Sequence, residues 1–99
     1  MSFHLRRIKD GSGDSGSRSE SISWTSEGKF DKIDGYIPKI GNSILVGSIT
    51  ARSYSHQDYW LTTPVIEILE EIKNDNVHYI RFSTENSEYE WWTGNYPKN

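Results

Sequence analysis

The sequence predicts a small, mainly β protein, built as an antiparallel sheet or partly open barrel or roll of five or six strands. Short segments alternate apolar and polar residues with a period of two, as half-buried strands do. Turn signals made of Gly, Asn, Asp and Pro recur between these segments, and the chain has no internal repeat or heptad pattern. A length of 99 residues fits one domain with a modest core.

The composition limits how that core is made and which partners suit it. Only 33% of the residues are hydrophobic, so four Trp, six Tyr and three Phe must supply much of the buried area. The net charge of −3 disfavours nucleic acid as a partner, and the absence of Cys excludes disulfides and thiolate metal sites. No window has the apolar length of a signal peptide or a membrane helix, so we expect a soluble, cytoplasmic protein without membrane contact.

The chain divides into three predicted parts. Residues 1–9 form an N-terminal strand or a detached basic arm, because Phe3, Leu5 and Ile8 alternate with His and Arg. Residues 10–21, DGSGDSGSRSES, have the composition of a flexible Gly/Ser-rich linker or loop. Residues 22–97 form a single β domain.

The domain begins with two strand signals. Ile22 and Trp24 alternate with Ser and Thr, and a short strand follows around Phe30 to Ile33. Residues 43–53 read as a strand with Leu45 on one face and Ile44 and Val46 on the other.

Residues 64–73 fit either a strand or a short helix. Val65, Ile68, Leu69 and Ile72 have helical spacing after a Thr-Pro start, whereas the β-branched run and the KNDN turn that follows favour a strand.

A hairpin is predicted from residues 77–84 and 87–93, joined through Glu85 and Asn86. Alternation assigns four aromatic and aliphatic residues to the core: Ile80, Phe82, Tyr89 and Trp91. Trp92 shares the other face with Glu88 and Glu90, which we interpret as the solvated face of an edge strand.

This region resembles a T-[ST]-x-V … T-x-N-S-x-Y pattern found in small uncharacterised bacterial and phage β proteins. The matching residues are Thr62 to Val65 and Phe82 to Tyr89, so the resemblance covers about thirty residues. It implies a compact β module from a bacterium, phage or mobile element, and it assigns no catalytic residue.

Catalytic and metal signals are weak. His4, His56 and His78 have no metal-ligand spacing, and we expect no cofactor or metal. His56 with Asp58 could form an acid–base pair, but no nucleophile elbow accompanies it.

Recognition is the function class that remains. Aromatic and arginine side chains exceed what so small a core needs, and these types dominate binding hot spots. The candidate binding residues are Arg52, Tyr54, Trp60, Tyr79, Arg81 and Trp92. We therefore expect a non-enzymatic module that binds a protein partner, and the resemblance implies a role as an accessory or counter-defence protein of a phage or mobile element. The alternative is a protein that sequesters a small nucleotide-like ligand between aromatics and arginines. Exposed sheet edges also predict a homodimer.

Overall fold

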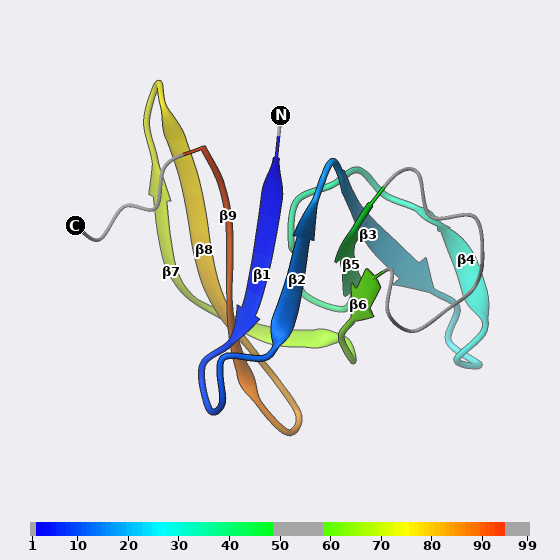
Figure 1. The fold of residues 1–99 in the computed structure, drawn as a ribbon. Helices are drawn as coiled ribbons and strands as arrows, with labels where there is room; N and C mark the ends of the chain where they lie inside the picture. Colours follow the sequence, from blue (N-terminus) through cyan, green and yellow to red (C-terminus); the bar gives the residue numbers. More distant parts are fainter. Residues whose placement is uncertain (1, 49–58, 95–99) are drawn as a thin grey trace.

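The computed structural model describes residues 2–48 and 59–94, and in these residues the protein is all β with two antiparallel sheets that do not close into a barrel. The five-stranded sheet has the order β2-β1-β9-β8-β7, and the four-stranded sheet has the order β4-β3-β5-β6 (Figure 1). The strands are β1 (Phe3–Arg7), β2 (Gly13–Gly16), β3 (Arg18–Trp24), β4 (Phe30–Ile33), β5 (Ser43–Gly47), β6 (Tyr59–Leu61), β7 (Val65–Lys73), β8 (Val77–Thr84) and β9 (Glu88–Gly94). The mainly β prediction is confirmed, with two sheets in place of one.

The core lies between the two sheets. Inward-facing residues of β1, β8 and β9 meet Ile44 and Val46 of β5, both of which are fully buried. The buried cluster consists of Phe3, Leu5, Ile44, Val46, Val65, Ile80, Phe82, Tyr89 and Trp91. All four core residues predicted for the β8–β9 hairpin are in this cluster, so the predicted faces of that hairpin are confirmed.

The N-terminal segment is an internal strand. β1 pairs with β9 on one side and with β2 on the other, through Leu5↔Trp91 and Leu5↔Asp14. Of the two alternatives for residues 1–9, the strand is therefore the one observed.

Residues 10–21, expected to be a flexible linker or loop, contain β2 and the first half of β3. Close packing between strands explains why Gly13 and Gly16 are glycines. A Cβ at Gly13 would overlap the carbonyl oxygen of Leu5, and one at Gly16 would overlap that of Gly47. Only glycine allows β2 to approach its neighbours this closely, so a composition typical of linkers here serves strand contact.

β7 settles the alternative between strand and helix for residues 64–73. The pairing with β8 shifts between Val65 and Glu67 and again between Ile68 and Glu70. These irregularities put Val65 and Ile68, three residues apart, opposite the inward-facing Thr84 and Phe82. Two bulges in a strand thus produce the spacing that resembles a helix, and the short helix is not formed.

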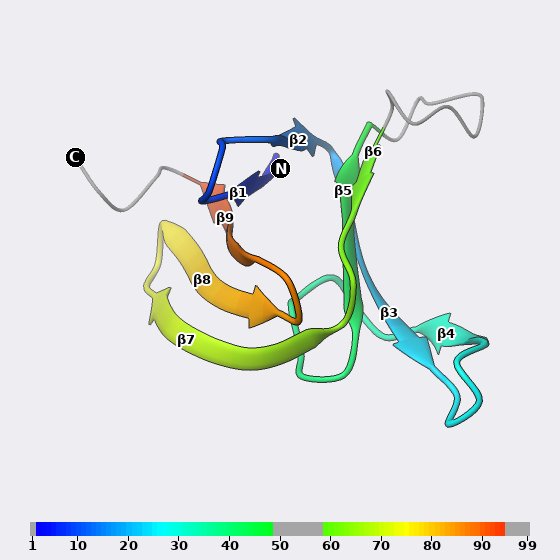
Figure 2. The same ribbon diagram turned by 90° about the horizontal axis from the view of Figure 1, so that it is seen from below.

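The two sheets present opposite outward faces. Seen from below, β7 curves around β8 on one side while the β3–β4 hairpin points away on the other (Figure 2). The outward face of each sheet therefore lies on its own side of the core.

Candidate functional site

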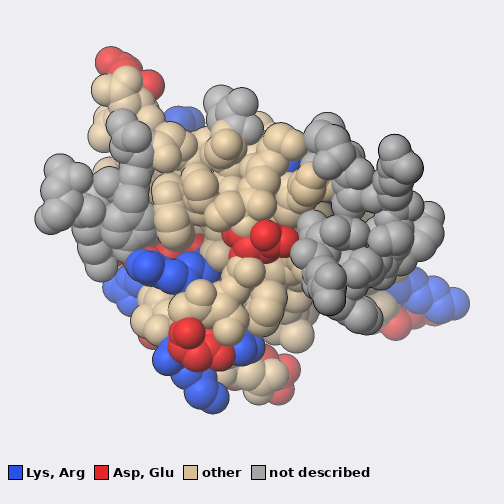
Figure 3. All heavy atoms as spheres, in the orientation of Figure 1, with Lys and Arg blue, Asp and Glu red and all other residues tan. Residues whose placement is uncertain are grey.

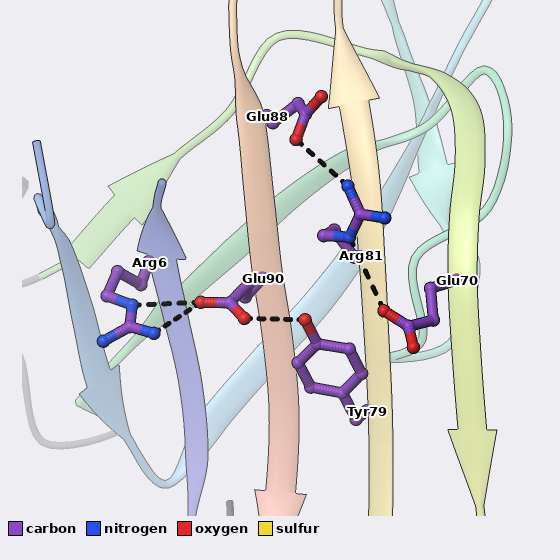
Figure 4. Close-up of polar contacts among 6 residues, drawn as sticks. All are labelled: Arg6, Glu70, Tyr79, Arg81, Glu88 and Glu90. Carbon is purple, nitrogen blue, oxygen red and sulfur yellow. Dashed lines mark hydrogen bonds and ion pairs between the residues drawn. The ribbon is translucent and has the colours of Figure 1, made fainter. Parts of the chain in front are cut away.

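The outward face of the five-stranded sheet collects polar and aromatic side chains from four strands (Figure 4). Tyr79 lies opposite Trp92, and Arg81 opposite Glu90, between β8 and β9. β1 adds His4 opposite Trp92 and Arg6 opposite Glu90. We call this surface the outer polar face; its residues are His4, Arg6, Glu70, Tyr79, Arg81, Glu88, Glu90 and Trp92.

Glu90 is the centre of the face and is only 3% exposed. Its Oε1 accepts hydrogen bonds from Arg6 Nε at 3.1 Å and Arg6 Nη2 at 2.5 Å. Its Oε2 accepts one from the hydroxyl of Tyr79 at 2.6 Å. A buried carboxylate requires such partners, so these contacts fix both Arg6 and Tyr79. The expectation that Glu90 lies on a solvated edge is wrong, because β1 covers that edge of β9.

Arg81 lies between two carboxylates on the exposed part of the same face. Its Nη1 is 3.2 Å from Glu88 Oε2, and its Nε is 3.6 Å from Glu70 Oε1. Desolvation lowers the pKa of Arg81, but the hydrogen bond and charge of Glu88, with the charge of Glu70, outweigh it and raise the pKa. Exposed pairs of this kind contribute little to folding but hold the guanidinium in place.

Trp92 is half-buried at the β1 side of the face. The His4 ring stacks on it at 5.1 Å between centroids and 19° between planes, and Arg6 Cζ lies 5.7 Å from its ring centroid. His4 Nδ1 is 2.8 Å from Ser15 Oγ, and partial burial lowers the His4 pKa. The indole is thus held by neighbours while part of its surface meets solvent.

A hollow of about 340 Å³ lies beside this cluster. It is lined by Leu5, Arg6, Gly11, Gly13, Asp14, Ser15 and Trp92. Trp92 forms one wall of this hollow.

The structure brings together three of the six predicted binding residues and separates a fourth. Tyr79, Arg81 and Trp92 share the outer polar face, although Tyr79 is fully buried and so holds Glu90 without presenting its own ring. Trp60 instead packs against the core, with its Nε1 donating to the Tyr89 hydroxyl at 3.4 Å. Arg52 and Tyr54 lie outside the described residues.

Sequence reasoning missed His4, Arg6 and Glu90 as members of the site. Their alternation places His4 and Arg6 on one face of a strand, which the sequence shows. No short stretch of sequence predicts that β1 pairs with β9, because Arg6 and Glu90 are 84 residues apart in the chain.

Among the described residues, no group of three or more His, Asp or Glu side chains could hold a metal ion. His78 is buried, with its ring 2.7 Å from Glu71 Oε2 and edge-on to Trp91. The pair His56 and Asp58 lies outside the described residues.

Within the same residues, no helix is long and apolar enough to cross a membrane. The chain matches no protein-family model, no curated protein and no solved structure.

Proposed function

We propose that this protein is a non-enzymatic binding module that docks on a protein partner through the outer polar face. The observation that carries the proposal is the half-buried Trp92 on an internal strand, which His4 and Arg6 both contact. An aromatic side chain already fixed in place loses little conformational entropy when a partner covers it. Tryptophan and arginine are also the residue types most enriched in binding hot spots.

The charges of the face support a protein partner. The face carries both signs close together, Arg6 beside Glu90 and Arg81 between Glu88 and Glu70. On the side of the molecule drawn in Figure 3, blue and red groups also lie next to one another. A partner with its own mixed polar rim can match this pattern, whereas a nucleic acid backbone requires a field of one sign.

The second candidate is a small nucleotide-like ligand, which the hollow beside Trp92 favours. A base could contact the part of the indole that lines the hollow, and a phosphate could approach Arg6. However, Arg6 binds Glu90 through two nitrogens, so a phosphate would compete with a carboxylate already in place. We therefore prefer the protein partner.

The accessory or counter-defence role in a phage or mobile element is part of the proposal. It is supported by the resemblance of residues 62–65 and 82–89 to small bacterial and phage proteins.

The test is capture of a partner from the lysate of a bacterial host, followed by titration of the purified partner with wild type and with Trp92→Ala. We expect the substitution to weaken binding by at least about thirtyfold, the size of a hot-spot loss. Ile66→Ala is the matched control, because Ile66 is an exposed apolar residue on β7 outside the outer polar face.

Circular dichroism and urea unfolding must show that Trp92→Ala is folded. A folded variant that binds the partner with unchanged affinity would refute the proposed surface. Native mass spectrometry separates the two candidates, because a small mass released only on denaturation would favour the nucleotide-like ligand.

A further inference from the structure

The outward face of the four-stranded sheet has a different character from the outer polar face. β3 places Ile22 opposite Ile33 and Trp24 opposite Phe30 of β4, and β5 places Leu45 opposite Leu61 of β6. Residues opposite each other in antiparallel strands point to the same face. We call this surface the apolar outer stripe; it consists of Ile22, Trp24, Phe30, Ile33, Leu45 and Leu61.

The stripe points away from the core. Ser19 and Ser21 alternate with Ile22 on β3, and Ser19 Oγ accepts a hydrogen bond from Trp91 Nε1 across the two sheets. On β5, Ile44 and Val46 enter the core cluster and the intervening Leu45 does not. Alternation therefore directs the stripe residues outward.

Three residues of the stripe, which lie on the two edge strands β4 and β6, are open to solvent. Phe30 is 58% exposed, Ile33 51% and Leu61 44%. Ile22 and Leu45 are largely buried, with exposed fractions of 8% and 7%. Trp24 is half-buried, and its Nε1 donates a hydrogen bond to Ser43 Oγ at 2.9 Å. Several large apolar side chains gathered on one side of a soluble domain are typical of an interaction surface.

The charges on this face are balanced within one copy. In the part of the chain that the structure describes, Arg18 and Glu20 are the charged residues that the strand register places beside the stripe, and they pair at 3.0 Å. The net charge of −3 therefore resides elsewhere on the chain. A face of zero net charge with one positive and one negative group is complementary to itself.

We propose that a second copy of this chain packs on the apolar outer stripe, sheet against sheet, to form a twofold-symmetric dimer. In such an isologous contact the same patch serves both copies, so Arg18 of each copy can pair with Glu20 of the other. Two sheets packed face to face lie about 10 Å apart, a distance that side chains of this size fill. The balanced charge disfavours an anionic membrane surface, which attracts faces rich in Lys and Arg.

The size of the face suits a weak dimer contact. The first and last of four strands about 4.8 Å apart lie about 14 Å from each other, and the seven residues of β3 span about 24 Å. Contacts that bury less than about 1,200 Å² in total are typical of weak, transient association. This inference does not depend on the outer polar face, which lies on the other sheet and stays accessible in the dimer.

The first measurement is the mass of the wild-type chain by light scattering between about 1 and about 200 μM. We expect a shift with concentration from 11.5 kDa towards twice that value. The double variant Phe30→Ser and Ile33→Ser should stay at the monomer mass. Ile66→Ser with Ile72→Ser, a pair of exposed isoleucines on β7, is the matched control and should dimerise as wild type does.

A charge exchange tests whether the occupant is a second copy in this orientation. Arg18→Glu gives the face two negative charges, and Glu20→Arg gives it two positive charges. Each variant alone should dimerise at least about tenfold more weakly than wild type, and an equimolar mixture should recover a mixed dimer. If one variant does not fold, Ile33→Ser and Leu61→Ser tested singly replace it.

Three results would overturn the proposal. They are a wild-type chain that stays monomeric over the whole concentration range, a dimer that survives the Phe30 and Ile33 substitutions, and charge variants that do not recover dimerisation when mixed. A wild-type monomer that binds neutral lipid vesicles through the stripe would assign the surface to a membrane instead.

Discussion

The outward faces of the two sheets differ in the side chains that they leave exposed to solvent. On the five-stranded sheet, Glu90 is buried and bonded to Arg6 and Tyr79, and Arg81 forms separate ion pairs with Glu88 and Glu70. On the four-stranded sheet, the stripe leaves Phe30 and Ile33 more than half exposed. The polar face depends on contacts within the chain for its stability, whereas the stripe has apolar area still available for a partner. The same contrast predicts that substitutions on the two faces have different effects on folding.

The largest effect is expected for Arg6→Met. This substitution removes two hydrogen bonds and the positive charge from a carboxylate that is 3% exposed. Because Arg6 itself is 46% exposed, the free energy of unfolding should fall by about 2 kcal/mol, less than for a fully buried pair. Urea denaturation at neutral pH measures this.

The double variant Arg6→Met and Glu90→Gln is the control for that prediction. Removing the charge of Glu90 as well should restore a large part of the loss, because the buried side chain at position 90 is then neutral. If both single and double variants unfold at the wild-type urea concentration, the outer polar face is not held together by this pair.

A small effect is expected for Ile33→Thr on the apolar outer stripe. Ile33 is 51% exposed, so the free energy of unfolding of the dilute monomer should change by less than about 0.5 kcal/mol. The matched substitution Val46→Thr lies on the core side of the same sheet, where the residue is fully buried, and should cost about 1–3 kcal/mol. Equal losses at the two positions would mean that the stripe is packed within the monomer.

The smallest effect concerns pH and belongs to the outer polar face alone. Desolvation lowers the pKa of His4, so the folded state binds a proton less readily than the unfolded state does. The associated stability is fully present above the unfolded pKa of about 6.5 and declines as the pH falls towards the lower folded pKa.

We therefore expect the melting temperature to fall slightly more between about pH 7.5 and about pH 5.5 in wild type than in His4→Gln. Differential scanning calorimetry compares the two proteins. An identical pH profile would show that protonation of His4 is not coupled to folding.

The core of the β8–β9 hairpin could be predicted because its information is local. Ile80 and Phe82 alternate along one strand, Tyr89 and Trp91 along the next, and a short turn fixes their register. The outward position of Trp92 follows from the same alternation. Its surroundings do not, because His4 and Arg6 come from the other end of the chain.

Two wrong or incomplete expectations have equally specific causes. The bulges of β7 shift its alternation, so Val65 and Ile68 have the spacing of a helix. A glycine that permits close contact between strands cannot be told from a glycine of a flexible linker by sequence, so the composition predicts a linker or loop where β2 forms.

A period of two over a few residues is enough to predict the β character, the aromatic core of one hairpin and the faces on which Trp92, Tyr79 and Arg81 lie. Contacts between distant strands set the rest: β1 covers the edge of β9, Glu90 is buried, and Phe30 and Ile33 share a face with Leu61. These features depend on which strands become neighbours. Pairing between distant segments is set by the packing of the whole core, and no short stretch of sequence specifies it.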